Sequence, residues 1–385
     1  MSTQTESSPR RYDLDWLRVL AILAVFVFHS GRFFDQMDWH VKSATVYSGA
    51  QAWTLFLIGW LMPLMFVISG ASLFYAVGKG SIIGFVRDKV LRLLVPFLVG
   101  VFTHVVLAVY LERITHNQFS GSFFTFYPHY FEGMYGFGGN FAWMGLHLWY
   151  LLVLFLFTLV FLPLFYLLKG FARGLLNKLG DFLAAPGVIL VLILPVVWLS
   201  AVLDPRSALG QRNFGGWPVP VYLLYLFYGF IIFSHLHLQG QIRKMRMFYL
   251  AAALVASAIL FWHFGYVVPR KGTQSQWYFG LLFIVSSWCW ILAFIGFIIK
   301  YLLTNGPFLK YANEAVLPFY IMHQTVLLLI GYLILDWQIS DPVKWLLIAL
   351  SSFALVLGLY EFAIRRFNIL RILFGMKLLL NAKKW

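Results

Sequence analysis

Arg18 and His29 are the residues of this sequence whose types and spacing are best suited to chemistry. The ten residues between them, Val19 to Phe28, are all apolar. Because an α-helix has 3.6 residues per turn and rises 1.5 Å per residue, both side chains would lie on one stripe of a helix, about 16 Å apart along its axis. Imidazole exchanges protons near neutral pH and guanidinium carries a fixed positive charge. An ionisable side chain at membrane depth costs several kcal/mol unless it faces a protein cavity, so we expect the chemistry at this pair.

Each residue of the pair also has a structural interpretation. Arg18 could extend to the lipid headgroups, since long basic side chains near the end of a span keep their charge in water. His29 could instead hydrogen-bond to a neighbouring helix. Location favours the functional interpretation, because Arg18 lies near one membrane surface and His29 lies beyond the middle of the same predicted span.

The elements that position the pair are predicted to be membrane-spanning helices. Hydrophobic residues make up 61% of the 385 residues, charged residues make up 11%, and the mean hydropathy is +0.81. This composition excludes a water-soluble domain and predicts an all-α, polytopic integral membrane protein with about ten transmembrane helices. Apolar runs of about 20 residues, the length that spans a bilayer, lie at 16–34, 53–77, 93–111, 147–168, 185–202, 219–235, 247–264, 277–299, 316–335 and 343–363.

These runs divide the chain into three segments. We expect a cytoplasmic N-terminal tail at 1–15, a ten-helix transmembrane domain at 16–363 and a basic cytoplasmic C-terminal tail at 364–385. The first run follows a pair of arginines, as a signal peptide would. No small-residue cleavage site closes this run, so we expect it to be retained.

The distribution of Lys and Arg predicts the orientation of the chain. An even number of spans places both termini on one side of the membrane. Twenty of the 29 Lys and Arg residues fall in the termini and loops of that side, and eight fall in the loops of the other side. Positive charge collects on the cytoplasmic side, so we expect both termini there. The same bias explains most of the +15 net charge, so it does not indicate nucleic-acid binding.

Several short motifs, placed in order on successive predicted spans, resemble those of the membrane acyltransferase-3 family. Besides the Arg18 and His29 pair, they are Phe66–Gly70 (FVISG), His147–Leu151 (HLWYL) and Tyr320–His323 (YIMH). The resemblance covers about residues 12–375. The similarity is greatest to the branch of the periplasmic glucan succinyltransferase (glucan biosynthesis protein C), at His147–Trp149 and at three further segments: Trp39–Val41, Tyr360–Phe362 and Ile369–Phe374.

The resemblance implies a multi-pass enzyme of the bacterial cytoplasmic (inner) membrane. Such an enzyme takes an acyl group, acetyl or succinyl, from cytosolic acyl-CoA and transfers it to a hydroxyl of an extracytoplasmic carbohydrate or glucan. The hydroxyl needs a base, because its pKa lies far above 7, and the thioester oxygen needs a positive or hydrogen-donating group. We therefore expect His29 to act as the base and Arg18 to orient the donor. Direct transfer of the acyl group is favoured, and a covalent acyl-histidine intermediate is the alternative.

Residues for donor binding are expected near the cytoplasmic surface. Arg87, Lys89 and Arg92 lie in the loop before the third span, where the resemblance implies recognition of CoA phosphates. Alternatively, these residues only set the topology of the chain. His323 is expected about two turns into the ninth span, where it would line the donor channel. No metal or other cofactor is expected.

Residues for acceptor binding are expected at the external surface. His147 opens the fourth predicted span beside Trp149, and Arg32 and His40 lie in the loop after the first span. Each could contact a carbohydrate, although an interfacial role is the alternative for His147 and Trp149. The aromatic loop at 112–146 could stack on a sugar or anchor the protein at the bilayer interface. A cation near its distal carboxylate would stabilise a bound succinyl group, and Arg18 or Arg32 could supply that cation.

Two other classes of function stay open. A secondary transporter or exporter would have similar hydropathy, but coupled transport usually needs embedded carboxylates and broken helices in two repeats, and neither is evident in the sequence. Glu361, the acid nearest a span interior, is expected to pair with Arg365. A lipid-linked glycosyl or phosphate transferase would need acidic metal ligands, and Asp35 and Asp38 lack companions. The single cysteine, Cys289, excludes an intramolecular disulfide.

Overall fold

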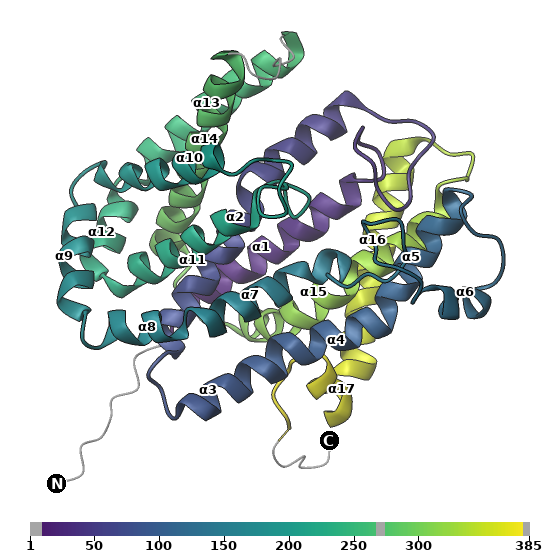
Figure 1. Ribbon diagram of the computed structural model, residues 1–385, viewed down its shortest axis with the longest axis horizontal. Coiled ribbons are helices and arrows are strands. Elements are labelled where there is room, and N and C mark those ends of the chain that lie inside the picture. The colour runs from purple at the N-terminus through teal and green to yellow at the C-terminus, as the bar shows by residue number, and fades with distance from the viewer. Residues whose placement is uncertain (1–9, 267–273, 380–385) are drawn as a thin grey trace.

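The computed structural model describes residues 10–266 and 274–379, and within them the chain forms helices and no β-strand (Figure 1). The predicted all-α, polytopic membrane fold is confirmed. Five helices in the described part are long and apolar enough to cross a membrane on their own. They are α1 (Tyr12–Gly31), α2 (Ser48–Ala76), α14 (Gln274–Tyr301), α15 (Pro307–Ile334) and α16 (Asp341–Leu359), which continues into the π-helical turn η4 (Tyr360–Ile364).

Bent helix pairs make up much of the remaining bundle. Four pairs in the described part pass the same length and hydropathy test only when their halves are joined, which raises the number of spans to as many as nine. The angles at their breaks are 40°, 57°, 114° and 100° in chain order. The pairs are α3 (Ile82–Lys89), η1 (Val90–Leu94) and α4 (Val95–Phe102) with α5 (His104–Thr115); η2 (Leu146–Leu148) and α7 (Trp149–Val160) with α8 (Leu162–Lys169); α9 (Arg173–Leu183) with η3 (Val188–Leu192) and α10 (Ile193–Val202); and α11 (Val219–Ser234) with α12 (Leu236–Lys244).

The ten predicted runs all fall on helices, but a break lies inside two of them, 93–111 and 147–168. The runs 185–202 and 219–235 each correspond mainly to one half of a bent pair, because the break lies at the start of the first and at the end of the second. The sharpest break, between α9 and η3, follows Pro186, and Gly187 adopts φ +79°, a conformation that favours glycine. At the break between α11 and α12, His235 leaves the helical conformation and its Nδ1 accepts the Leu238 backbone N–H as an N-cap. The seventh run corresponds to α13 (Arg246–Tyr266), and short helices α6 (Phe123–His129) and α17 (Asn368–Leu373) complete the fold.

The helix that carries Arg18 and His29 lies inside the bundle. α1 packs against α2, α14, α15 and α16, and Figure 1 shows it crossing the centre of the molecule. Between the two polar residues, Val19, Ile22 and Phe26 are buried in the core, whereas Leu20 is exposed on the apolar outer side. α1 is unbroken from Tyr12 to Gly31, so Arg18 and His29 lie on one rigid helix.

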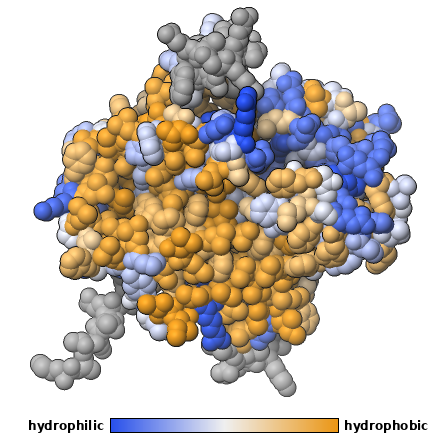
Figure 2. Space-filling view, in the orientation of Figure 1, coloured by the Kyte–Doolittle hydropathy of each residue, from blue (hydrophilic) through white to orange (hydrophobic). Residues whose placement is uncertain are grey.

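The outer surface of the bundle is apolar, as a bilayer requires. Figure 2 shows hydrophobic residues over most of one face, with hydrophilic residues gathered toward one corner. On the bent pairs, large apolar side chains point outward rather than into the core. They include Leu98 and Phe102 of α4, Leu156 and Val160 of α7, and Leu164 and Leu167 of α8. The chain is therefore a multi-pass membrane protein.

Two glycines allow α2 and α11 to make backbone contact. A Cβ atom added at Gly70 would lie 1.9 Å from the carbonyl oxygen of Leu226, and one added at Gly229 would lie 1.9 Å from that of Val67. Helices approach this closely only where a small residue faces the partner backbone. The glycine of the Phe66–Gly70 motif is therefore a packing residue.

We predict that Gly70→Ala destabilises the folded protein by about 1–3 kcal/mol, because the new methyl group would overlap the backbone of α11. Gly358→Ala is the matched control, since that glycine is also helical and a Cβ there meets nothing within 4 Å. Thermal unfolding in detergent, followed by intrinsic fluorescence, compares the two. Equal melting temperatures for both variants would contradict the backbone contact.

Candidate active site

A cavity of about 630 Å³ opens at the end of the bundle where α1 begins, which we call the terminal end. Its walls come from α1, α2, α3, η1, α7, α15, α17 and the segment after α17. Arg10 and Lys377 both line it, so the two described chain ends lie close together. Among the described residues, the lining is strongly basic and includes one acid, Glu314. The basic residues that line the cavity are Arg10, Arg18, Lys89, Arg92, Lys310, Arg371 and Lys377.

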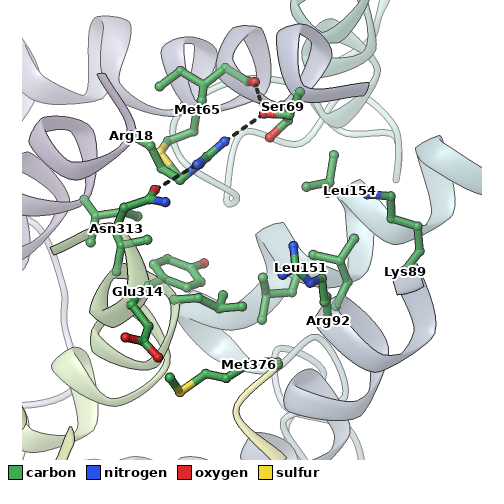
Figure 3. Close-up of a pocket in the computed structure, with 18 of the residues that line it drawn as sticks. Arg18, Met65, Ser69, Lys89, Arg92, Leu151, Leu154, Asn313, Glu314 and Met376 are labelled. Atoms are coloured by element: carbon green, nitrogen blue, oxygen red, sulfur yellow. Dashed lines mark hydrogen bonds between the residues drawn. The ribbon is translucent and has the colours of Figure 1, made fainter. Parts of the chain in front are cut away.

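Arg18 lies on the cavity wall and is held in place by three side chains. Its Nη1 donates to Asn313 Oδ1 at 3.0 Å and to Asp15 Oδ1 at 3.3 Å, and its Nη2 donates to Ser72 Oγ at 2.9 Å. Figure 3 shows Arg18 and Asn313 on one side of the cavity, with Lys89 and Arg92 across from them. Positive charge therefore faces the cavity from opposite walls.

The structure separates the three basic residues that were expected to bind the donor. Lys89 and Arg92 line the cavity from α3 and η1, whereas Arg87 is exposed and is not among the lining residues. Arg87 and Lys89 both precede the π-helical turn η1 and are two positions apart on α3, which is about 200° around the helix, so they face nearly opposite directions.

His29 belongs to a cluster of four histidines beyond the cavity. The other members are His104 of α5, His147 of η2 and His323 of α15. His323 Nε2 lies 3.0 Å from His29 Nδ1, and the His147 ring centroid lies 5.1 Å from that of His323. The rings of His104 and His147 are 6.3 Å apart. Within residues 10–266 and 274–379, no group of three or more His, Cys, Asp or Glu side chains is arranged to hold a metal ion.

The placement of His323 differs from the sequence expectation. α15 begins at Pro307, nine residues before the predicted span, so His323 lies about four turns into the helix rather than two. It does not line the cavity but contacts His29. Hydropathy missed the first turns of α15 because Lys310, Asn313 and Glu314 make them polar where they face the cavity.

Two tyrosines stand between the cavity and the histidines. Tyr320 lines the cavity, donates its hydroxyl to the His147 carbonyl at 2.5 Å and accepts His323 Nδ1 at its own carbonyl at 2.6 Å. Tyr150 lines the cavity beside it and shares a 2.6 Å hydrogen bond with Ser69 Oγ. On α1 the cavity reaches Ile22, which is about 10 Å short of His29 along the helix.

Trp39 covers His29 on the side away from the cavity. The two rings stack with centroids 6.2 Å apart and planes at 23°. The Arg32 guanidinium lies 5.9 Å from the Trp39 ring centroid and pairs with buried Asp35, which also accepts Lys42 Nζ at 2.9 Å. Burial lowers the pKa of Lys42, and Asp35 opposes this by stabilising its charge. The loop after α1 is thus fixed by a buried ion network.

The remaining residues expected at the acceptor site have other contacts. His40 pairs with Glu112, which also accepts the Tyr135 hydroxyl at 2.7 Å. His147 is buried, and its Nε2 donates to the Ile321 carbonyl at 2.9 Å. Trp149 is buried in an aromatic group with Phe66, Phe214 and Tyr222. The predicted pairing of Glu361 with Arg365 is confirmed at 3.0 Å.

Comparison with known proteins identifies the family. Residues 11–361 match the family model for the acyltransferase domain of the acyltransferase-3 family. The chain belongs to this family. It is therefore a membrane acyltransferase. Neither curated proteins nor solved structures gave a match.

Sequence reasoning missed several residues of the acyltransferase site. Asn313 and Ser72 hold Arg18, Tyr320 separates the cavity from the histidines, and His104 completes the cluster. His104 carried a usable signal, because it is a histidine within the predicted span 93–111. Tyr320 belongs to the Tyr320–His323 motif but was given no role of its own, and Asn313 and Ser72 carried no signal, since their role arises from contacts between distant parts of the chain.

The C-terminal segment of the acyltransferase forms part of the cavity wall. Arg371, which is 4% exposed, donates to Glu314 Oε1 at 2.9 Å and to the carbonyls of Arg365 and Lys377 at 3.0 and 2.7 Å. These bonds hold the chain after α17 against α15 and bring Lys377 to the cavity.

We predict that Arg371→Ala releases the segment after α17 and destabilises the protein by about 2 kcal/mol, because it leaves several hydrogen-bond partners of a charged group unpaired. Limited proteolysis should cleave the variant near residue 377 faster than the wild type. Arg366→Ala is the control, because that side chain is exposed and bonds only the nearby Glu361 carbonyl. Unchanged cleavage of Arg371→Ala would show that the segment is held in another way.

Proposed function

We propose that this acyltransferase transfers an acyl group from cytosolic acyl-CoA to a hydroxyl of a carbohydrate on the opposite side of a bacterial inner membrane. The observation that carries the proposal is the arrangement along α1, where Arg18 faces a basic cavity and His29 belongs to a histidine cluster beyond it. One continuous helix thus joins a site for an anionic donor to a site for proton transfer. The proposal places the terminal end in the cytoplasm, in agreement with the excess of Lys and Arg there.

The cavity suits CoA by charge and by depth. CoA carries several phosphate charges at one end and a thioester at the end of a long flexible arm. Lys89, Arg92 and Lys310 are positioned to bind phosphate oxygens, for which Lys and Arg are the usual partners. Farther in, Met65, Leu151 and Leu154 provide apolar walls for the arm. Arg18 would then meet the acyl end, where it could also pair with the carboxylate of a succinyl group.

His29 suits the chemical step. In the proposed reaction the acceptor hydroxyl gives its proton to His29 Nε2 while its oxygen bonds to the thioester carbonyl carbon. The bond from carbon to sulfur then breaks, and the leaving CoA thiolate takes the proton back from the imidazolium. Because the cavity ends short of His29, the thioester must pass Tyr150 and Tyr320, whose hydroxyl contacts would open during entry.

The acceptor would approach from the side of Trp39. An indole ring offers an apolar face on which a sugar ring can stack, and Arg32 next to it offers hydrogen-bond donors. Acetyl and succinyl transfer are both compatible with this arrangement. More specifically, we propose a glucan as the carbohydrate acceptor. The similarity of Trp39–Val41 to the glucan succinyltransferase branch supports this choice.

A transporter remains a second candidate because of the four bent helix pairs. Broken helices line substrate sites in many carriers. The carboxylates that could couple transport are already engaged, however, since Glu112 pairs with His40 and Glu314 with Arg371. Family membership also favours acyl transfer.

Sealed inside-out vesicles test the reaction and its sidedness together. Vesicles loaded with glucan should acylate it when succinyl-CoA or acetyl-CoA is added to the bath, whereas right-side-out vesicles should not. Mass spectrometry of the glucan measures the product. His29→Ala is the control, with an expected loss of about 10²–10⁴ in rate. Equal acylation in both orientations, or normal turnover by His29→Ala, would contradict the proposal. Solute uptake without any CoA ester would support a carrier.

The position of Arg87 relative to Lys89 and Arg92 gives a sharper test of donor binding. We predict that Lys89→Ala and Arg92→Ala each raise the KM for acyl-CoA about fivefold with little change in kcat, because a partly exposed ionic contact is worth about 1 kcal/mol. Arg87→Ala should leave KM unchanged. The effect should shrink at high salt. Equal effects of all three substitutions on KM would contradict donor binding by Lys89 and Arg92. The basic residues would then serve only to set the orientation of the chain in the membrane.

A further inference from the structure

His29 and His323 form a pair whose hydrogen-bond partners define which nitrogen carries the proton. His323 Nδ1 lies 2.6 Å from the carbonyl oxygen of Tyr320, and its Nε2 lies 3.0 Å from His29 Nδ1. His29 Nδ1 also lies 3.0 Å from the carbonyl oxygen of Val25. Both carbonyls belong to the same helix as the histidine that contacts them.

A carbonyl oxygen only accepts hydrogen bonds, so each contact requires a proton on the nitrogen. His323 must therefore carry its proton on Nδ1, which leaves a lone pair on Nε2. His29 Nδ1 faces two acceptors, the Val25 carbonyl and this lone pair, so it must carry a proton and share it between them. The lone pair of neutral His29 is consequently on Nε2.

We propose that His323 is a positioning residue that holds His29 with its Nε2 lone pair available as the base. This inference rests on the proposed role of His29 in acyl transfer. The described residues provide no hydrogen-bond partner for His29 Nε2. When that atom takes the acceptor's proton, the Nδ1–H becomes part of an imidazolium, and its bonds to Val25 and His323 become charge-assisted and stronger. His323 thus stabilises the charge that forms during the reaction.

The surroundings of His323 suit this role. The side chain is 1% exposed, so water does not compete for its Nε2. Its ring stacks on Phe319, with an angle of 2° between the planes, and its edge faces His147. His147 in turn donates its Nε2–H to the Ile321 carbonyl, so its ring is also held against α15. The orientation of His323 is thereby fixed by α15 itself.

Two substitutions of His323, whose amide side chains differ in length, test the proposal. The amide of His323→Asn can still donate to the Tyr320 carbonyl but provides no acceptor where Nε2 was. The longer His323→Gln places a carbonyl oxygen near that position. We expect kcat to fall about 10- to 100-fold in His323→Asn, as for other groups that orient a functional histidine. Its KM for acyl-CoA should not change, and His323→Gln should recover most of the activity.

Nitrogen-15 NMR of protein labelled at histidine gives a second measurement that needs no variant of His323. The signals of His29 are those that disappear in His29→Ala, and they should show a neutral ring with the proton on Nδ1. A proton on Nε2 would overturn the proposal, as would full kcat in His323→Asn alongside an inactive His29→Ala. An active His29→Ala would instead overturn the proposed function, and the role of His323 with it.

Discussion

A polar side chain inside a membrane bundle must find its partners within the bundle, and this requirement shapes the site. The guanidinium of Arg18 is satisfied by Asn313, Asp15 and Ser72, which tie α1 to α2 and α15. His29 and His323 use backbone carbonyls of their own helices and then each other. Lipid offers no hydrogen bonds, so breaking such a set leaves several groups unpaired at once. The polar residues therefore fix how the helices pack.

The same requirement explains why the cavity and the histidines are separate. A cavity lined by seven basic residues is stable only where water or an anion can enter, at the end of the bundle. The facing nitrogens of His29 and His323 share one proton, so this pair needs no net charge and tolerates a dry interior. Tyr320 joins the two regions because its hydroxyl and its carbonyl each bond a histidine while its ring lines the cavity. A donor that reaches His29 must disturb contacts on which the histidine geometry depends.

The features that local sequence determines could be predicted. α1, its apolar run and the shared stripe of Arg18 and His29 follow from helical periodicity, and each predicted run falls on a helix. The bend at Gly187 and the early start of α15 at Pro307 were missed, because hydropathy averages over a window and discounts polar residues that face a cavity. Asn313 is 295 positions from Arg18, and no periodicity connects residues so far apart.

The accuracy of the role predicted for each site residue depended on how well its position along its helix could be read from the sequence. Arg18 and His29 lie on one unbroken helix, so their separation along α1 follows from the sequence alone. His323 was assigned to the donor channel because its distance from the start of the span was underestimated. Its contact with His29 requires α1 and α15 to pack together at that depth, and Gly331 leaves room there for the ring of Phe33, which follows α1, since a Cβ would lie 2.3 Å from that ring. Packing between α1 and α15, and not position along one helix, therefore decides which two imidazoles meet.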